Sequence, residues 1–325
     1  MMKKKYPALV LIFVGAFVCL PLIMNTEENY LIYYLFMTFT YVAMSQGFNI
    51  IAGYTGQVSL GSHAFFGLGA YTTVFAWEVA GLAYFNPLAI ALSGVLPAIV
   101  AVLIGIPLLS KLRGDYFSLG TLGLGEVLRV VFIQGRGVTG GSMGKYLPSG
   151  EYTSMFPYYY TALFLAVFAT AALYLLVRSR IGLALVAVRE DETAADANGI
   201  NILKYKLFAF AAGAFITGMC GSLQAYYLFH IHPQNFFGLS WTLFPILMCV
   251  LGGSGTIFGP VLGAFILTGV SETAKIWLPG IHPIISGLII IAAVLFLPDG
   301  LIRFKLKQIF AGRSLKNPFS KPLNP

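Results

Sequence analysis

The stretch GYTGQVSLGSHAFFGLGAY, residues 53–71, places five glycines between two strongly apolar runs. Apolar runs of about 20 residues recur along the whole chain, and each is long enough to cross a hydrocarbon core about 30 Å thick. In lipid only helices or a closed barrel satisfy every backbone polar group. Runs without alternation, such as ALVLIFVGAFVCL at 8–20, exclude the barrel pattern. The sequence therefore predicts an all-α polytopic membrane protein whose helices are interrupted by glycine.

The composition supports this fold class. The chain has 325 residues, of which 58% are hydrophobic and 10% charged, whereas a soluble domain carries about 25% charged residues.

We predict a transmembrane domain at 1–302 and a basic cytoplasmic tail at 303–325. Segment 239–251 is too short to span alone, and it leads into a second glycine-rich break, LGGSGTIFG, at 251–259. About ten apolar segments are expected, at 6–24, 30–52, 58–80, 87–110, 116–134, 157–177, 205–229, 239–251, 256–278 and 283–298.

The positions of the basic residues predict the orientation. With ten spans and a cytoplasmic N-terminus, sixteen of the 20 Lys and Arg residues fall in cytoplasmic regions. Cytoplasmic loops of membrane proteins carry such an excess, so we expect both termini to be cytoplasmic. The net charge of +8 then reflects topology and attraction to anionic lipid rather than nucleic-acid binding.

The longest predicted cytoplasmic loop, 178–206, is polar and helix-prone. Its charge cluster, Arg189, Glu190, Asp191 and Glu192, precedes a small-residue face formed by Ala194, Ala195 and Gly199. Gly199 stands where a helix C-terminal glycine is expected. A short helix with a small face and a charged rim suits docking into a groove of another protein. A solvated connecting helix is the alternative.

Several stretches resemble the permease subunit of bacterial ABC importers for branched-chain amino acids, in its LivM-like branch. The coupling loop of such importers has the pattern E-A-A-x-x-x-G, which Ala194, Ala195 and Gly199 match, although Thr193 stands where Glu is expected. The other stretches occur in family order. They are GYTGQVSLGSHAFFGLGAY (53–71), LRGDYFSLGTLGLGEVLR (112–129), RSRIGLALVAVREDETAADANGI (178–200), VLGGSGTIFGPVLGA (250–264) and LFLPDGLI (295–302).

The resemblance implies a partner set and an energy source. It implies a second permease subunit, two cytoplasmic ATPases that use ATP, and a periplasmic or extracytoplasmic solute-binding protein, at the bacterial inner membrane. The chain itself is expected to have no nucleotide site and so to bind no cofactor, because TGGSMGKY at 139–146 departs from the phosphate-loop pattern at both ends. It is also expected to bind no nucleic acid, to bind no metal, because His230 and His232 alone are too sparse a set, and to be no enzyme, because no nucleophile elbow or pair of catalytic carboxylates occurs. The solute would be a branched-chain amino acid or a relative such as urea or a short amide.

The resemblance also gives the glycine-rich breaks a function. Transporters expose backbone groups of broken helices to a cavity near the membrane midplane. Close helix packing is the alternative, because small residues let backbones approach. We assign Gly67, Gly69 and Gly263 to packing. The predicted path residues are Ser59, Gly61, Ser62, His63, Gly252, Gly253 and Gly255.

Ionisable residues within predicted spans are costly and often functional. Glu126 and Arg129 lie three residues apart, as do Glu272 and Lys275, so each pair is able to neutralise itself on one helix face. Structural pairing and a role in gating both remain open. A self-sufficient secondary transporter or channel, the rival class, needs an ion-coupling carboxylate, for which only Glu78, Glu126 and Glu272 are candidates.

Overall fold

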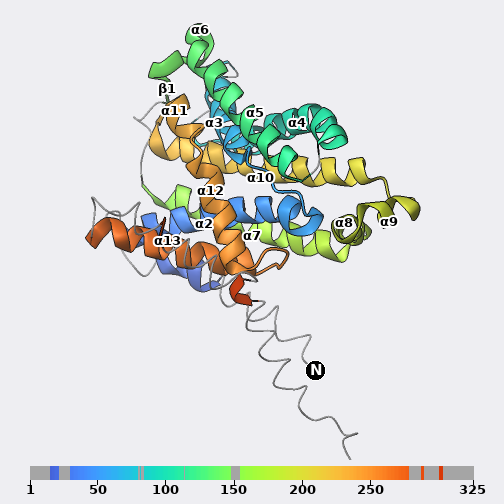
Figure 1. Cartoon of the computed structure of the whole chain (residues 1–325). Helices are drawn as coiled ribbons and strands as arrows, with labels where there is room; N and C mark the ends of the chain where they lie inside the picture. The colour runs from blue at the N-terminus through green and yellow to red at the C-terminus, as the bar shows by residue number, and fades with distance from the viewer. Residues whose placement is uncertain are drawn as a thin grey trace, which may run out of the picture.

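The computed structural model describes residues 15–21, 30–79, 81, 84–112, 114–147, 154–277, 287–288 and 300–302. The predicted segments 6–24 and 283–298 lie mostly outside these residues, and the basic tail at 303–325 lies entirely outside them. The described chain is built from helices, with one short two-stranded sheet (Figure 1).

Six helices in the described residues are long and apolar enough to cross a membrane. Each of them falls on a predicted apolar segment, and the all-α polytopic fold is confirmed. The segment predicted to be too short, 239–251, forms the 13-residue helix α12 (Ser240–Gly252), in agreement with that expectation. It reaches 20 residues only together with the short helix α11 (Pro233–Phe236) and the turn between them. The six are Tyr30–Gly53, Pro87–Lys111, Asp115–Gln134, Phe156–Arg178, Ile202–Leu228 and Pro233–Gly252.

Both glycine-rich stretches interrupt helices. Helix α2 (Tyr30–Phe48) continues as the π-helix η2 (Asn49–Gly53). Residues 56–61 are not helical, and α3 begins at Ser62. The predicted span 58–80 is corrected accordingly. Helix α12 ends at Gly252 and α13 begins at Gly259. The longer helices after the first break are α3 (Ser62–Glu78), α4 (Pro87–Lys111), α5 (Asp115–Gln134), α7 (Phe156–Arg178), α10 (Ile202–Leu228), α12 (Ser240–Gly252) and α13 (Gly259–Trp277).

The long helices form two layers (Figure 1). Helix α2 packs against α7 and α13 in one layer, and α10 packs against α3 and α4 in the other. Helix α12 contacts α2, α3 and α13 and so joins the layers. Because α10 also contacts α2, these two helices form the centre of the bundle, where their side chains are mostly buried.

Glycines bring the helices of the bundle into close contact. A Cβ atom added at Gly69 on α3 would overlap the Gly218 carbonyl on α10, and one at Gly263 would overlap the Met248 carbonyl on α12. A Cβ at Gly67 would lie 2.6 Å from the ring of Phe237. The packing role predicted for these three glycines is therefore confirmed: Gly69 and Gly263 allow close approach of helix backbones, and Gly67 makes room for an aromatic ring.

The two ends of the bundle carry different short elements (Figure 1). At one end, β1 (Lys145–Tyr146) pairs antiparallel with β2 (His230–Ile231), beside α6 (Arg136–Thr139), η3 (Gly141–Met143) and α11 (Pro233–Phe236). At the other end, α8 (Arg180–Glu190) and α9 (Glu192–Ala197) form the predicted loop. The sequence predicted no strand, because a two-residue strand is too short to leave an alternating pattern.

Candidate functional site

The two glycine-rich breaks meet, and the side chain of Asn49 joins them. Its amide nitrogen donates to the Thr256 carbonyl at 2.8 Å, and its amide oxygen accepts from the Gly255 N–H at 2.8 Å. One turn earlier, the Gln46 amide donates to the Ile257 carbonyl at 2.7 Å. Both amide side chains are fully buried. They hold backbone groups that the second break leaves without helical partners.

Sequence reasoning missed Gln46 and Asn49. The available signal was an amide pair, three residues apart and on one helix face, inside the apolar run 30–53. A buried amide needs hydrogen-bond partners, because leaving one unsatisfied costs about 1–3 kcal/mol. An irregular backbone segment at the same depth is a source of such partners.

Glycines shape the junction of the two breaks. A Cβ atom on Gly53 would lie 2.6 Å from the Gly255 nitrogen. Gly255 has φ of 74° and Gly253 has φ of 117°, conformations that residues with a side chain rarely adopt. Gly255 and Gly253 therefore occupy backbone conformations that glycine adopts readily. Gly252, the last residue of α12, lies directly against the Gly259 carbonyl.

The C-terminal end of the first break, at Leu60 and Gly61, packs against α5. A Cβ on Gly61 would lie 2.5 Å from the Thr121 carbonyl, so the backbones of the break and α5 approach closely at this residue. The Thr121 hydroxyl accepts from the Leu60 N–H at 3.0 Å, and Ser59, which is buried, accepts from the Gly61 N–H at 3.3 Å. Ser62 begins α3. The break is thus fastened to α5 by its own backbone.

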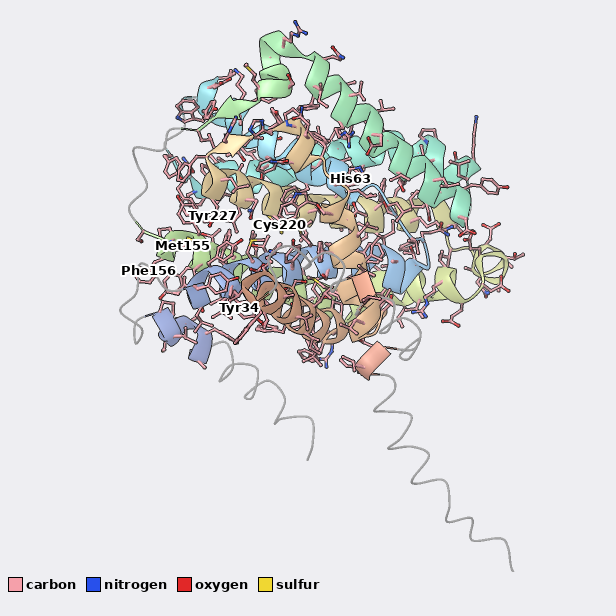
Figure 2. The ribbon with its side chains drawn as sticks, turned by 60° about the vertical axis from the view of Figure 1, so that its left-hand side comes forward. Tyr34, His63, Met155, Phe156, Cys220 and Tyr227 are labelled. Carbon is pink, nitrogen blue, oxygen red and sulfur yellow. The ribbon has the colours of Figure 1, made fainter. Side chains whose placement is uncertain are left out.

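His63 is buried at the junction of α3, α5 and α12 (Figure 2). Its backbone N–H donates to the Thr242 hydroxyl at 2.7 Å, and its Nδ1 lies 3.0 Å from the same oxygen. Its Nε2 has no hydrogen-bond partner in the described residues and lies against Gly125, where a Cβ would overlap the ring. The predicted path residues therefore form two groups, one at Gly252–Gly255 and one at Ser59–His63, joined by α12.

The intramembrane charges pair as the sequence suggested. Arg129 Nε lies 3.4 Å from Glu126 Oε2, and Lys275 Nζ lies 2.6 Å from Glu272 Oε1. Glu272 also accepts from the Tyr30 hydroxyl at 2.5 Å and is 5% exposed. The third carboxylate considered for ion coupling, Glu78, pairs with Lys145 Nζ at 2.8 Å. Each candidate carboxylate therefore has a basic partner.

The predicted loop folds as two short helices. Asp191 ends α8 and caps α9, because its carboxylate accepts from the Thr193 and Ala194 N–H groups at 2.8 and 3.0 Å. Gly199 has φ of 77°, and its N–H bonds the Asp196 carbonyl while the Ile200 N–H bonds that of Ala195. This is a Schellman motif. The C-terminal position predicted for Gly199 is confirmed.

Three of the seven predicted loop residues point into the chain itself. Arg189 donates to the Gly53 carbonyl at 2.6 Å, and Glu192 pairs with Lys206 Nζ at 2.5 Å. Ala195 is only 3% exposed, which corrects the expectation that it belongs to an exposed small-residue face. Glu190 and Ala194 are exposed, as are Asp191 and Gly199. The loop is thus attached to the first break.

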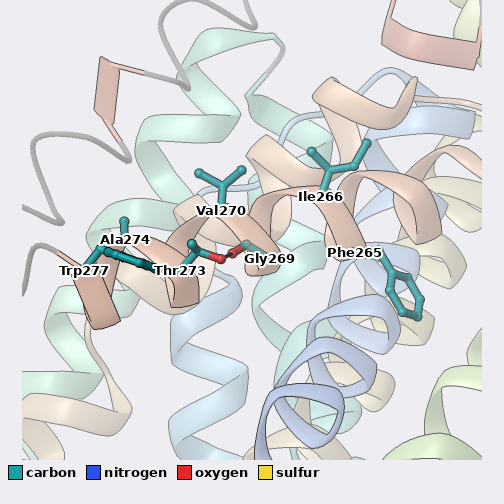
Figure 3. Close-up of a pocket in the computed structure, with 7 residues that line it drawn as sticks. All are labelled: Phe265, Ile266, Gly269, Val270, Thr273, Ala274 and Trp277. Carbon is teal, nitrogen blue, oxygen red and sulfur yellow. Dashed lines mark hydrogen bonds between the residues drawn. The ribbon is translucent and has the colours of Figure 1, made fainter. Parts of the chain in front are cut away.

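An open groove lies on the outer face of α13 (Figure 3). The only hydroxyl among its lining side chains, that of Thr273, already donates to the Gly269 carbonyl at 2.7 Å. None of the predicted path residues lines it, so the groove is an apolar surface rather than a solute site. Its lining residues are Phe265, Ile266, Gly269, Val270, Thr273, Ala274 and Trp277.

Comparison with known proteins identifies the family. Residues 30–294 match the family described as the branched-chain amino acid transport system / permease component, which is well over half of the 325 residues. The chain belongs to this family. The resemblance found in the sequence is therefore confirmed, and the protein is a membrane-spanning permease subunit of the ABC importer class.

Individual relatives cover most of the permease. The high-affinity branched-chain amino acid transport system permease protein LivM of Escherichia coli is 29% identical over 317 residues, covering 88% of this chain and 72% of the relative. A probable branched-chain amino acid transport permease protein LivM of Methanocaldococcus jannaschii is 31% identical over 182 residues, 54% and 52% of the two chains. The autoinducer 2 import system permease protein LsrC of Yersinia enterocolitica is 27% identical over 278 residues, 82% and 70% of the two chains. No solved structure matches the permease.

We predict that the junction of the breaks is required for transport. Asn49→Leu leaves the Gly255 N–H and the Thr256 carbonyl unsatisfied, and Gly255→Val forces a branched side chain into a left-handed conformation. At a cost of about 1–3 kcal/mol for each unsatisfied group, we expect uptake to fall about tenfold or more while membrane insertion persists. Radiolabelled uptake and quantification of the permease in membranes measure the two effects.

Gly15→Val is the matched control for this prediction, because a Cβ atom at Gly15 meets nothing within 4 Å. It should transport like the wild type. Uptake at the control level by both Asn49→Leu and Gly255→Val would show that the junction is incidental.

Proposed function

We propose that this permease forms, with a second permease subunit, the translocation path of an ATP-driven importer for branched-chain amino acids or related small solutes. Two cytoplasmic ATPases would hydrolyse the ATP, and a periplasmic or extracytoplasmic binding protein would deliver the solute. The observation that carries the proposal is the attachment of the α8–α9 loop to the first break, through Arg189 and the Gly53 carbonyl. A partner that moves this loop would act directly on the broken helices.

The solute class rests on the relatives. The LivM proteins of two organisms are named for branched-chain amino acids, and one of them is similar along 88% of the permease. The similarity extends to a permease named for autoinducer 2 import. Since selection by a binding protein would leave the path nearly non-specific, the solute is best identified by testing amino acids, urea and short amides together.

Helix α5 supports the need for a second permease subunit. Only 17% of the residues in the apolar stretch of this helix are buried by the rest of the chain. The helix nevertheless carries the Glu126–Arg129 pair, whose side chains are about 40% exposed. Exposing an ion pair to hydrocarbon is unfavourable, so such groups face protein or a water-filled cavity. We therefore assign the open side of α5 to the partner subunit and the path between them.

The end opposite α8–α9 suits the binding protein. Val138, Met143 and Tyr146 are 63%, 81% and 67% exposed there, the first two on the glycine-rich segment that leads into β1 and Tyr146 in β1 itself. Methionine and aromatic side chains are enriched at protein interfaces. A loop for the ATPases at one end and a surface for the binding protein at the other match the arrangement that an importer requires.

A self-sufficient ion-coupled transporter is disfavoured by the pairing of its candidate carboxylates. Glu78, Glu126 and Glu272 each lie within 4 Å of a basic side chain. An ion-coupling carboxylate has to gain and lose its cation during transport, whereas each of these three is already paired with a basic side chain of the same chain. Energy from ATP hydrolysed by partner subunits requires no such group.

Reconstitution tests the proposed function. We expect the permease to copurify with a second permease subunit and two ATPases, and to support uptake of a branched-chain amino acid only with ATP and the loaded binding protein. A panel of leucine, urea and acetamide identifies the solute class. Uptake by the permease alone, driven by an ion gradient, would contradict the proposal.

Single-cysteine labelling tests the orientation. In a background without Cys19, Cys220 and Cys249, a cysteine at position 190 should react only with a reagent that enters the cytoplasm. One at position 137, which is exposed at the opposite end, should react from outside. Labelling of position 190 from outside would overturn cytoplasmic termini and the ATPase-facing loop together.

Substitutions on the exposed side of the loop test ATPase docking. Glu190→Lys reverses a charge at the C-terminal end of α8, where a cation is favourable to the helix, and Ala194→Trp adds bulk on an exposed face. Both should fold but lose ATPase copurification. Charge reversal in a buried contact costs several kcal/mol, and a bulky side chain prevents a small-residue face from fitting a groove.

The matched control is Met143→Trp, which adds a large side chain at the opposite end, where Met143 is 81% exposed. It should copurify with the ATPases at the wild-type level. If Glu190→Lys and Ala194→Trp also do so, the loop is a solvated connection rather than a docking element.

A further inference from the structure

The charge cluster of the loop divides into two groups of different function. Arg189 and Glu192 are directed into the chain, whereas Glu190 is exposed and forms no ion pair or hydrogen bond within the described residues. We propose that Arg189 and Glu192 are positioning residues that transmit motion of the α8–α9 loop to the first break, rather than contacts for the ATPases. This inference rests on the proposed function, and it assigns transmission and docking to different residues of one short segment.

Arg189 donates a hydrogen bond to a carbonyl group at the end of a helix. The helix Tyr30–Gly53 stops before the non-helical residues 56–61, and the last carbonyls of a helix have no partner in the helix itself. The Arg189 guanidinium donates to the Gly53 carbonyl at 2.6 Å, and its Cγ is the nearest atom to a Cβ built on Gly56, at 3.4 Å. A cation also interacts favourably with the negative end of the helix dipole. Arg189 therefore joins the end of α8 to the end of this helix.

Glu192 makes the second link. Its Oε1 atom lies 2.5 Å from Lys206 Nζ, whose side chain is only 3% exposed, and accepts from the Gln57 amide at 3.3 Å. Gln57 belongs to the first break, and Lys206 lies in the second turn of α10. A buried ammonium group needs a partner of opposite charge. Glu192 thus fastens the start of α9 both to the break and to the central helix.

The links continue to the second break. The Gly53 carbonyl accepts the hydrogen bond from Arg189. Gly53 itself lies so close to the second break that a Cβ atom built on it would be 2.6 Å from the Gly255 nitrogen. The Asn49 side chain, in the same π-helical turn, holds Gly255 and Thr256. Contacts this close do not allow one segment to move without its neighbour. Displacement of the loop would accordingly move both breaks.

Substitution of Arg189 separates transmission from docking. We expect Arg189→Gln to copurify with the ATPases within about twofold of wild type but to lower solute uptake per ATP hydrolysed by about tenfold or more, which corresponds to about 1.4 kcal/mol or more. Glu190→Lys should do the opposite and lose the ATPases themselves. Arg189→Lys, which keeps a cation but not the planar fork, should recover part of the coupling.

A charge exchange provides the second measurement, and it applies even if one single variant is poorly produced. Glu192→Lys places two ammonium groups together and should lower coupling, and adding Lys206→Glu should restore it. A purely structural role would change melting temperature and uptake in parallel, with uptake per ATP unchanged. That result, or loss of ATPase copurification by Arg189→Gln, would overturn the inference.

Failure of the proposed function would look different. In that case the wild-type complex itself would show no uptake that depends on ATP. With an active wild-type complex, normal coupling by both Arg189→Gln and Glu192→Lys would reject the transmission role alone.

Discussion

A helix that ends inside a membrane exposes amide and carbonyl groups that lipid does not hydrogen-bond, and the rest of this fold depends on how those groups are satisfied. The Asn49 amide supplies one donor and one acceptor to the second break, and Gln46 supplies another donor one turn earlier. Two interrupted helices from distant parts of the sequence thereby become one junction. Without these side chains, each interruption would carry the cost of unpaired backbone groups.

Glycine has two separate functions in the same molecule. At Gly69, Gly218 and Gly263 it lets regular helices touch backbone to backbone, which makes the bundle compact. At Gly253 and Gly255 it permits backbone angles that residues with a side chain rarely adopt, which allows the chain to turn between α12 and α13. The first function belongs to the stable scaffold. The second creates the irregular backbone that distinguishes a transporter from a simple helical bundle.

The α8–α9 loop illustrates how a charged surface segment serves internal structure. Asp191 caps α9, Glu192 neutralises Lys206, and Arg189 completes the end of the helix that precedes the first break. Only Glu190 in this cluster of four has its side chain exposed without a bond in the described residues. A charge cluster is therefore poor evidence of a docking surface until the partners of each side chain are known. Here the same cluster links the loop to the interior of the bundle.

The sequence by itself determined the fold class, the family and the location of both breaks, because hydropathy, glycine content and motif order are local properties. It also predicted the pairs Glu126–Arg129 and Glu272–Lys275, since residues three or four apart on one helix meet whatever the surroundings. The turn at Gly199 was predicted because glycine commonly ends a helix. The tertiary structure decided which distant groups meet. Asn49 with Gly255, Arg189 with Gly53, and the burial of Ala195 involve residues far apart in the chain. No local periodicity encodes such contacts, because they arise only when the helix layers close and unpaired backbone groups find buried side-chain partners.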